Sequence, residues 1–188
     1  RPRLRDTIRL VCRDGQMLPL LLAVAMVAVA VDPVNNLTPA FSVEVYGRTD
    51  TFTGVLTGSF GIGAAFGAAL IVARARASLR NISMAMTLVG VTIIGFGIST
   101  SGVVGIGVLF VAGLAFIVSV SLATTMVHMN VTDEHRGRVM ALWGVAFLGV
   151  RPVASLVDGL VATWLGLRYA AVVMPLPVLV GAAYIVRR

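Results

Sequence analysis

Charge is the property that this chain has least of. Charged residues make up only 12% of it, and from Asn81 to Thr132 there is no Asp, Glu, Lys or Arg. Hydrophobic residues make up 58%, against roughly 45–50% in soluble domains. A bilayer core of about 30 Å takes about 20 residues per helix, so the uncharged stretch is long enough for two spans with a turn at Ser99 to Gly102. The composition predicts a membrane protein.

Lysine is absent and cysteine occurs once, as Cys12. Without Lys there is no Walker-type nucleotide loop, and one Cys excludes an internal disulfide. No GxSxG or HExxH motif occurs, and His128 and His135 have no Cys or acidic ligands suitably spaced around them. We expect no enzymatic activity, catalytic residue, cofactor or metal site. The net charge of +7 is better explained by topology signals between apolar runs than by nucleic-acid binding.

Six long apolar runs predict six transmembrane helices, because each exceeds the length of a buried soluble helix and β-barrel alternation is absent. The fold class is therefore all-α. We expect a cytoplasmic linker at residues 1–16 and a six-helix bundle at 17–188. The predicted spans are Met17–Phe41, Thr51–Ala73, Asn81–Ser99, Gly102–Met129, Val139–Leu165 and Tyr169–Val186.

The placement of arginine predicts the orientation of the bundle. An even number of spans puts both termini and two loops on one side, and the opposite side then holds only Arg48 and Arg168. Positive residues mark the cytoplasmic side, so we expect both termini in the cytoplasm of a cell with the protein in its plasma or inner membrane. The arginines on that side are Arg1, Arg3, Arg5, Arg9, Arg13, Arg74, Arg76, Arg80, Arg136, Arg138, Arg187 and Arg188.

The second span is rich in glycine and contains two GxxxG spacings, Gly54/Gly58 and Gly63/Gly67. Small residues let helices approach closely in a bilayer, where water supplies no hydrophobic drive between them. Two interpretations stay open: tight packing within the bundle, or a sliding interface between moving halves.

Three ionisable residues fall inside the spans: Asp32, Arg151 and Asp158. Each costs about 2.5–3.5 kcal/mol to insert, so such residues normally face protein or a water-filled cavity. Arg151, Ser155 and Asp158 are spaced i, i+4, i+7, which places them on one helix face. Arg151 and Asp158 are too far apart for a simple intrahelical ion pair, so we expect Arg151 to pair with a residue on another helix. Besides Asp158, Asp32 is the only mid-membrane acid that could be this partner.

This charged group has three possible roles. The first is an ion pair that locks two helices together, and the second is a proton or substrate-cation site at Asp32 or Asp158 whose protonation Arg151 controls. In the third, Asp158 merely reaches the outer interface.

The first span is interrupted in its outer half, where Pro33 and Pro39 bracket Asn35, Asn36 and Thr38. Proline removes an amide donor and frees a carbonyl, and broken helix at membrane depth is tolerated where it lines a cavity or is covered by protein. Interrupted helices are frequent at the substrate sites of secondary transporters. This segment predicts either a substrate-facing surface or a kinked packing helix.

The segment Asp133–Arg138 precedes the fifth span and contains Asp133, Glu134, Arg136, Gly137 and Arg138. It resembles the acidic-x-Arg-Gly-Arg loop that leads into span eleven of the major facilitator superfamily. The continuation from Trp143 to Leu167 is similar to the branch that includes the enterobactin exporter and related drug:proton antiporters. For Arg136 to Arg138 both topology anchoring and a conformational latch stay open.

The resemblance covers essentially the whole chain and implies the C-terminal six-helix half of a twelve-span transporter, built as two inverted three-helix repeats. It implies that the first and fourth spans line a central cavity and that the second and fifth meet an N-terminal half. The implied function is proton-coupled export of small amphipathic or siderophore-like molecules by alternating access. The expected partners are the lipid bilayer, the N-terminal half, a small-molecule substrate and protons.

One departure limits the resemblance. The segment from Gly67 to Arg76 has the arginines of the family's signature between spans eight and nine but no Asp. The family's proton-coupling acids usually lie in the N-terminal half, so a coupling role for Asp32 or Asp158 is not inherited. The alternative function is a non-transporting six-span scaffold, or a protomer that needs a partner chain.

Overall fold

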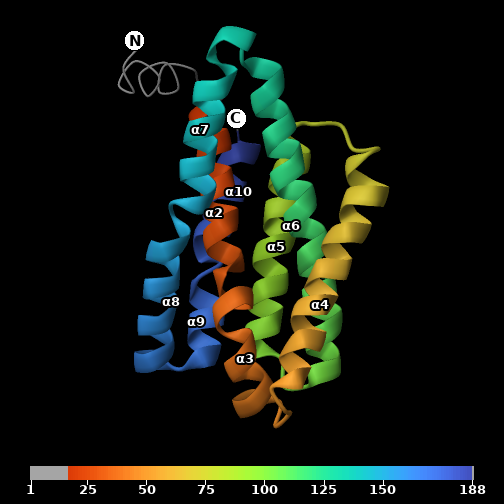
Figure 1. Cartoon of the computed structure of the whole chain (residues 1–188), viewed down its shortest axis with the longest axis vertical. Helices are drawn as coiled ribbons and strands as arrows, with labels where there is room; N and C mark the ends of the chain where they lie inside the picture. Colours follow the sequence, from red (N-terminus) through yellow and green to blue (C-terminus); the bar gives the residue numbers. More distant parts are fainter. Residues whose placement is uncertain (1–16, 188) are drawn as a thin grey trace.

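The computed structural model of the chain describes residues 17–187, and these are helical apart from short connections. Six helical units are long and apolar enough to cross a membrane, which confirms the predicted all-α fold with six spans (Figure 1). The predicted linker at 1–16 lies outside the described residues. The elements are α2 (Met17–Asn36), α3 (Thr38–Ala40), the π-helical η1 (Phe41–Val45), α4 (Thr51–Phe66), the π-helical η2 (Gly67–Val72), α5 (Leu79–Ile98), α6 (Gly102–Asn130), α7 (Asp133–Leu148), α8 (Arg151–Leu165), α9 (Leu167–Val173) and α10 (Leu176–Val186).

Two predicted boundaries are wrong. The first span continues through α3 and η1 to Val45, beyond the predicted end at Phe41, because Pro39 lies in the first turn of α3 and the chain stays helical after it. The fifth span was predicted from Val139, but its helix begins at Asp133, so Arg136 to Arg138, which were predicted as a loop, are helical, whereas a helix start at the acidic residues was expected. Acidic side chains are favourable in the first turn of a helix, where the dipole is positive, and Asp133 occupies that turn.

The spans run alternately up and down, and the described connections fall at two ends of the bundle (Figure 1). The end that carries the start of α2 also carries the η2–α5 and α6–α7 connections and the end of α10. Among the described residues, six arginines lie in or beside these segments, whereas Arg48 and Arg168 lie at the opposite end. The unequal distribution predicted from the sequence is therefore retained in three dimensions.

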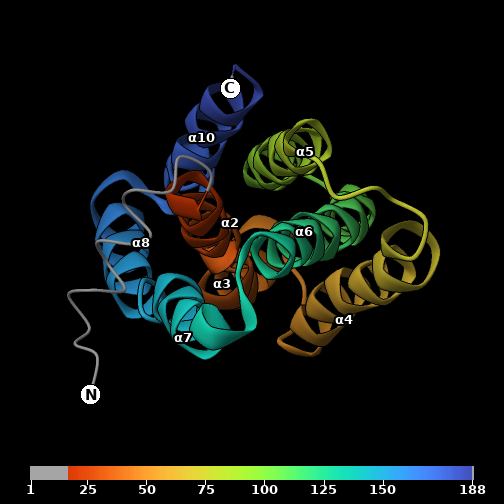
Figure 2. The same ribbon diagram turned by 90° about the horizontal axis from the view of Figure 1, so that it is seen from above.

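The first three spans and the last three make equivalent contacts. The fourth span, α6, packs against α4 and α5, and the first span, α2, packs correspondingly against α7 with α8 and against α10. The two central helices α2 and α6 also contact each other (Figure 2). Because each group has three spans, the second group starts from the opposite end, so the two groups are inverted repeats.

Burial differs sharply among the spans. The first span is the most buried, and the second and fifth are the most exposed. In the view along the bundle, α4 and α7 lie on either side of α6, and α5 and α10 lie on the side away from α3 and α7 (Figure 2). The exposed faces of α4 and of α7 with α8 carry large apolar side chains such as Val55, Ile62, Val145 and Leu156.

The contact between α4 and α6 has no room for a side chain at its centre. A Cβ atom on Gly63 would overlap the backbone carbonyl of Phe110, and one on Gly113 would overlap that of Phe60. Gly54 and Gly58 have no atom within 4 Å of such a Cβ position. Of the two GxxxG spacings, the one that includes Gly63 therefore packs inside the bundle, and the other faces outward.

Candidate functional site

Asp32 lies at the centre of a polar cluster between α2 and α8. Its side chain is almost fully buried, and its Oδ2 atom accepts hydrogen bonds from Asn36 Nδ2 at 2.6 Å and from Ser155 Oγ at 2.7 Å. The Oδ1 atom lies 3.9 Å from Arg151 Nε. The structure thus brings Arg151 to Asp32, the partner on another helix that the sequence predicts.

A break in the fifth span positions the residues of α8. Helix α7 ends at Leu148, and α8 restarts at Arg151 with Pro152 in its first turn, where the missing amide of proline costs no hydrogen bond. Their i, i+4, i+7 spacing then places Arg151, Ser155 and Asp158 on the face of α8 that meets α2. Ser155 and Arg151 contact Asp32, and Asp158 is completely buried.

Asp158 differs from Asp32 in that its carboxyl oxygens have no partner within hydrogen-bonding geometry among the described residues, although the Asn36 side chain lies near them. Both carboxyl oxygens are buried, and neither forms a hydrogen bond with the part of the chain that the structure describes. Asp32 and the Asn36 amide are the groups near enough to act on it electrostatically. Burying an unpaired carboxylate in an apolar environment is very costly, whereas the neutral acid is tolerated at much lower cost. Asp158 is therefore the group in this cluster whose charge the surroundings do not balance.

Asn35 is the predicted site residue that does not join the cluster. Its Nδ2 atom donates to the Val31 carbonyl at 3.3 Å, and Thr38 Oγ1 similarly donates to the Val34 carbonyl. These side chains donate to backbone carbonyls close to Pro33 and Pro39, where the missing proline N–H groups leave fewer backbone donors. Asn35 and Thr38 thus support the interrupted helix, while Asn36, one residue further along, reaches Asp32.

The predicted cytoplasmic segment forms the first turns of α7. Arg136 pairs with Asp133 at 2.8 Å, and both side chains are largely exposed. Gly137 has open space around it, and Arg138 is partly buried. Glu134 belongs to the same helix, but its side chain lies outside the described part. The Asp133–Arg136 pair stays within one helical turn, so it does not tie α7 to another span.

A row of aromatic side chains, which the sequence analysis missed, crosses α4, α6 and α7. The ring centroids are 5.6 Å apart for Phe60 and Phe116, 6.2 Å for Phe116 and Phe147, and 5.1 Å for Phe147 and Trp143. All four side chains are half-buried. A sequence signal exists for part of the row: Trp143, Phe147 and Arg151 are spaced by four residues.

The family comparison decides the class of the protein. A family model described as Transmembrane secretion effector, from the major facilitator superfamily, matches residues 4–188. The chain belongs to this family. No curated protein and no solved structure gives a significant match. As a major facilitator family member, the chain is a multi-pass membrane transporter protein, and its class points to movement of a small-molecule substrate rather than to enzymatic chemistry.

Proposed function

We propose that this chain is the C-terminal half of a proton-coupled exporter that works by alternating access. Its substrate is a small amphipathic or siderophore-like molecule, as the resemblance to the enterobactin-exporter and drug:proton antiporter branch suggests. The family description, Transmembrane secretion effector, agrees with outward transport. The observation that carries the coupling part of the proposal is Asp158, a buried carboxyl group whose oxygens form no hydrogen bond with the described residues.

Proton coupling requires a group whose protonation changes the preferred packing of two helices. Neutral Asp158 fits against α2 as observed, because it carries no charge that needs a partner. When Asp158 loses its proton, the new anion repels Asp32 and attracts the Asn36 amide that now donates to Asp32. A redistribution of Asn36, Ser155 and Arg151 between the two carboxylates then shifts α8 along or away from α2. A change in protonation is thereby converted into a change in helix packing.

The aromatic row supplies the apolar part of the proposed substrate surface. Phe147 precedes Arg151 by four residues, so the row and the polar cluster adjoin along the fifth span. Aromatic rings offer flat apolar area to a ligand, and a cationic ligand also gains from their faces. A surface that is aromatic on one side and charged on the other suits an amphipathic molecule.

The exposed second and fifth spans support the proposed pairing with an N-terminal half. Gly54 and Gly58 on α4 and Gly144 and Gly159 on α7 and α8 all have open space where a Cβ would lie, and such positions let another helix approach closely. The arginine-rich end faces the cytoplasm in this proposal. Arg136 and Arg138 then anchor that end at the anionic inner leaflet.

The test is efflux from cells or inverted vesicles that contain the full-length transporter, measured with and without a pH gradient. Asp158→Asn is expected to lower gradient-driven efflux at least tenfold, because an amide cannot release a proton. Asp32→Asn and Arg151→Ala should also lower gradient-driven efflux, since they remove the charged groups that respond to deprotonation of Asp158. The matched control is Asp50→Asn, the same substitution at an exposed acid that forms no side-chain cap hydrogen bond in the connection before α4.

Each variant must be shown to insert normally in the membrane before efflux is compared. Loss of efflux in Asp158→Asn with wild-type efflux in Asp50→Asn would support the coupling role. If Asp158→Asn and Asp32→Asn, tested as separate variants, both kept full gradient-driven efflux, the coupling role would be overturned. The cluster would then be only a contact between helices. Failure of all forms, wild type included, to move any amphipathic substrate would contradict the substrate class.

A further inference from the structure

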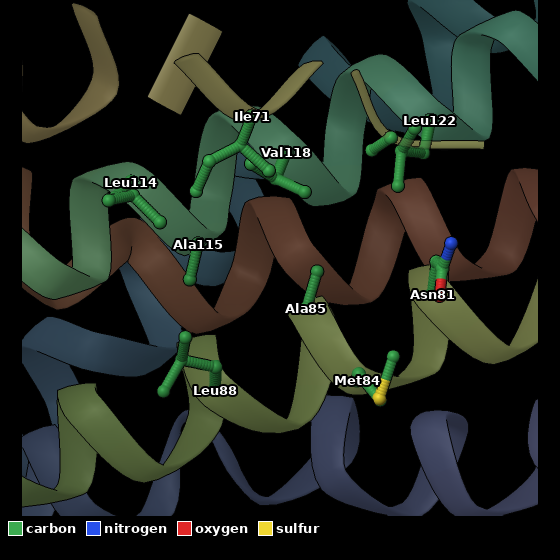
Figure 3. Close-up of a pocket in the computed structure, with 10 residues that line it drawn as sticks. Ile71, Asn81, Met84, Ala85, Leu88, Leu114, Ala115, Val118 and Leu122 are labelled. Atoms are coloured by element: carbon green, nitrogen blue, oxygen red, sulfur yellow. The ribbon is translucent and has the colours of Figure 1, made fainter. Parts of the chain in front are cut away.

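A pocket of about 320 Å³ lies between η2, α5 and α6, far along the sequence from the polar cluster. Ile71, Leu88 and Leu122 contribute to its walls, and Ala85 and Ala115 contribute small side chains that leave the space open (Figure 3). Every lining residue except Asn81 is apolar. This space suits a hydrocarbon chain and offers little to a polar solute.

Three exposed arginines are adjacent in the sequence to residues that line the pocket. Its lining residues Ala75 and Asn81 alternate with or adjoin Arg74, Arg76 and Arg80, all three of which are exposed. Within the described chain no carboxylate lies within ion-pair distance of these arginines. The sequence has no acid at all between Asp50 and Asp133, so no residue in that long stretch could neutralise them.

The connection that carries these arginines has a defined shape. The Asn81 side chain donates to the Arg76 carbonyl at 2.8 Å, and Ser78 Oγ accepts from the Asn81 amide at the start of α5. Arg74 Nη1 donates to the Leu70 carbonyl at 3.0 Å. The guanidinium groups are therefore carried by an ordered connection, and Ala75 and Asn81 near its two ends line the apolar pocket.

We propose that this pocket and turn bind an anionic phospholipid, with one acyl chain in the pocket and the phosphate group against Arg74, Arg76 and Arg80. Guanidinium groups bind phosphate with paired, charge-assisted hydrogen bonds. Basic pockets between transmembrane helices on the cytoplasmic side are suited to anionic headgroups. The pocket is lined by η2, α5 and α6 and by no residue of α2 or α8, so a lipid there leaves the polar cluster free.

The bound lipid would link the second and third spans, which have few direct contacts with each other. Helices α4 and α5 each pack on α6, but the connection between η2 and α5 is the main link between the second and third spans (Figure 2). A lipid seated across η2, α5 and α6 adds contacts to all three. We therefore expect the lipid to stabilise this side of the bundle.

The experiment measures lipid binding to the full-length protein in detergent by native mass spectrometry. Phosphatidylglycerol, phosphatidylcholine with the same acyl chains, and inorganic phosphate are compared as probes. The triple variant Arg74→Gln, Arg76→Gln and Arg80→Gln should bind phosphatidylglycerol about 100-fold more weakly, at about fivefold for each cationic group lost near the headgroup. The matched control replaces three arginines at the same end with Gln: Arg136, Arg138 and Arg187.

A second variant tests the acyl-chain pocket separately. Ala85→Leu fills the space and should weaken binding of both phospholipids, whereas Val91→Leu, on an exposed part of the same helix, should not. Equal binding of the two phospholipids by wild type, or equal losses in the Arg74–Arg80 variant and its control, would overturn the headgroup assignment. Wild-type binding by Ala85→Leu would overturn the acyl-chain assignment, and so would inorganic phosphate binding as tightly as phosphatidylglycerol.

Discussion

The α4–α6 contact and the α2–α8 contact join helix pairs in the same apolar environment by opposite means. Gly63 and Gly113 let the backbones of α4 and α6 touch, so that contact depends on shape alone. Asp32 instead meets Ser155 and Arg151 across a polar contact with several possible partners. A contact between backbones has one good arrangement, whereas hydrogen-bonding partners can be exchanged at similar free energy. The comparison indicates which side of the bundle is fixed and which can change.

The largest expected effect is loss of stability when the glycine contact is filled. Gly113→Ala places a methyl group against the Phe60 carbonyl, which cannot move without shifting α4, so we expect a loss of about 3 kcal/mol in the free energy of unfolding. Thermal unfolding in detergent measures it. Gly107→Ala on the same helix has open space and should be neutral or slightly stabilising. Equal melting temperatures for the two variants would contradict the shape-only account of this contact.

The next effect is loss of the partners of Asp32. In Asp32→Asn the Arg151 guanidinium loses its counter-charge, and the hydrogen bonds from Asn36 and Ser155 lose their charged acceptor. We expect a cost of about 1–2 kcal/mol, because Arg151 is 36% exposed and an exposed ion pair contributes little. Equilibrium unfolding in mixed micelles checks the value. A stability equal to that of Gly113→Ala would mean that this contact is as rigid as the glycine contact.

Substitution of Asp158 should affect stability in the opposite way from substitution of Asp32. Asp158→Leu removes a buried polar group with no partner, so the free energy of unfolding should stay unchanged or rise by up to about 1 kcal/mol. Gradient-driven efflux should nevertheless be lost. The same unfolding and efflux assays give both values. A clearly destabilised Asp158→Leu protein would show that the carboxyl group has a structural partner after all.

The smallest effect concerns Ser155. Ser155→Ala removes one hydrogen bond to Asp32, which within a membrane contributes about 0.6 kcal/mol. Because Asn36 still donates to the same oxygen, efflux should fall less than threefold. The matched control is Thr163→Ala, whose hydroxyl donates only to its own helix at Gly159. A loss of efflux as large as that of Asp158→Asn would make Ser155 part of the proton path.

The sequence predicts most of this fold because the bilayer imposes strong rules on composition. Uncharged runs and arginine positions were sufficient to find six spans, and the period of an α-helix placed Arg151, Ser155 and Asp158 on one face. The fifth span was predicted only from Val139, where the charges end, although Asp133 and Glu134 already indicate a helix start and α7 does begin at Asp133.

The candidate site was predictable in its residues but not in its partners. Sequence shows that buried charges must be satisfied, but not that Asn36 turns toward Asp32 while Asn35 bonds to its own helix. Nor does it show that Asp158 is left without a partner. The aromatic row was missed because it joins Phe60 and Phe116 across different spans, and such contacts depend on how helices rotate against one another.

The most direct test of the central claim is infrared difference spectroscopy of the full-length protein between acidic and alkaline pH. The claim is that Asp158 takes up and releases a proton, and a neutral carboxyl group has a carbonyl stretch that the carboxylate lacks. We predict a pH-dependent carboxylic-acid band in wild type that is absent in Asp158→Asn and retained in Ser155→Ala. An identical band in wild type and Asp158→Asn would contradict the account, because another group would then carry the proton.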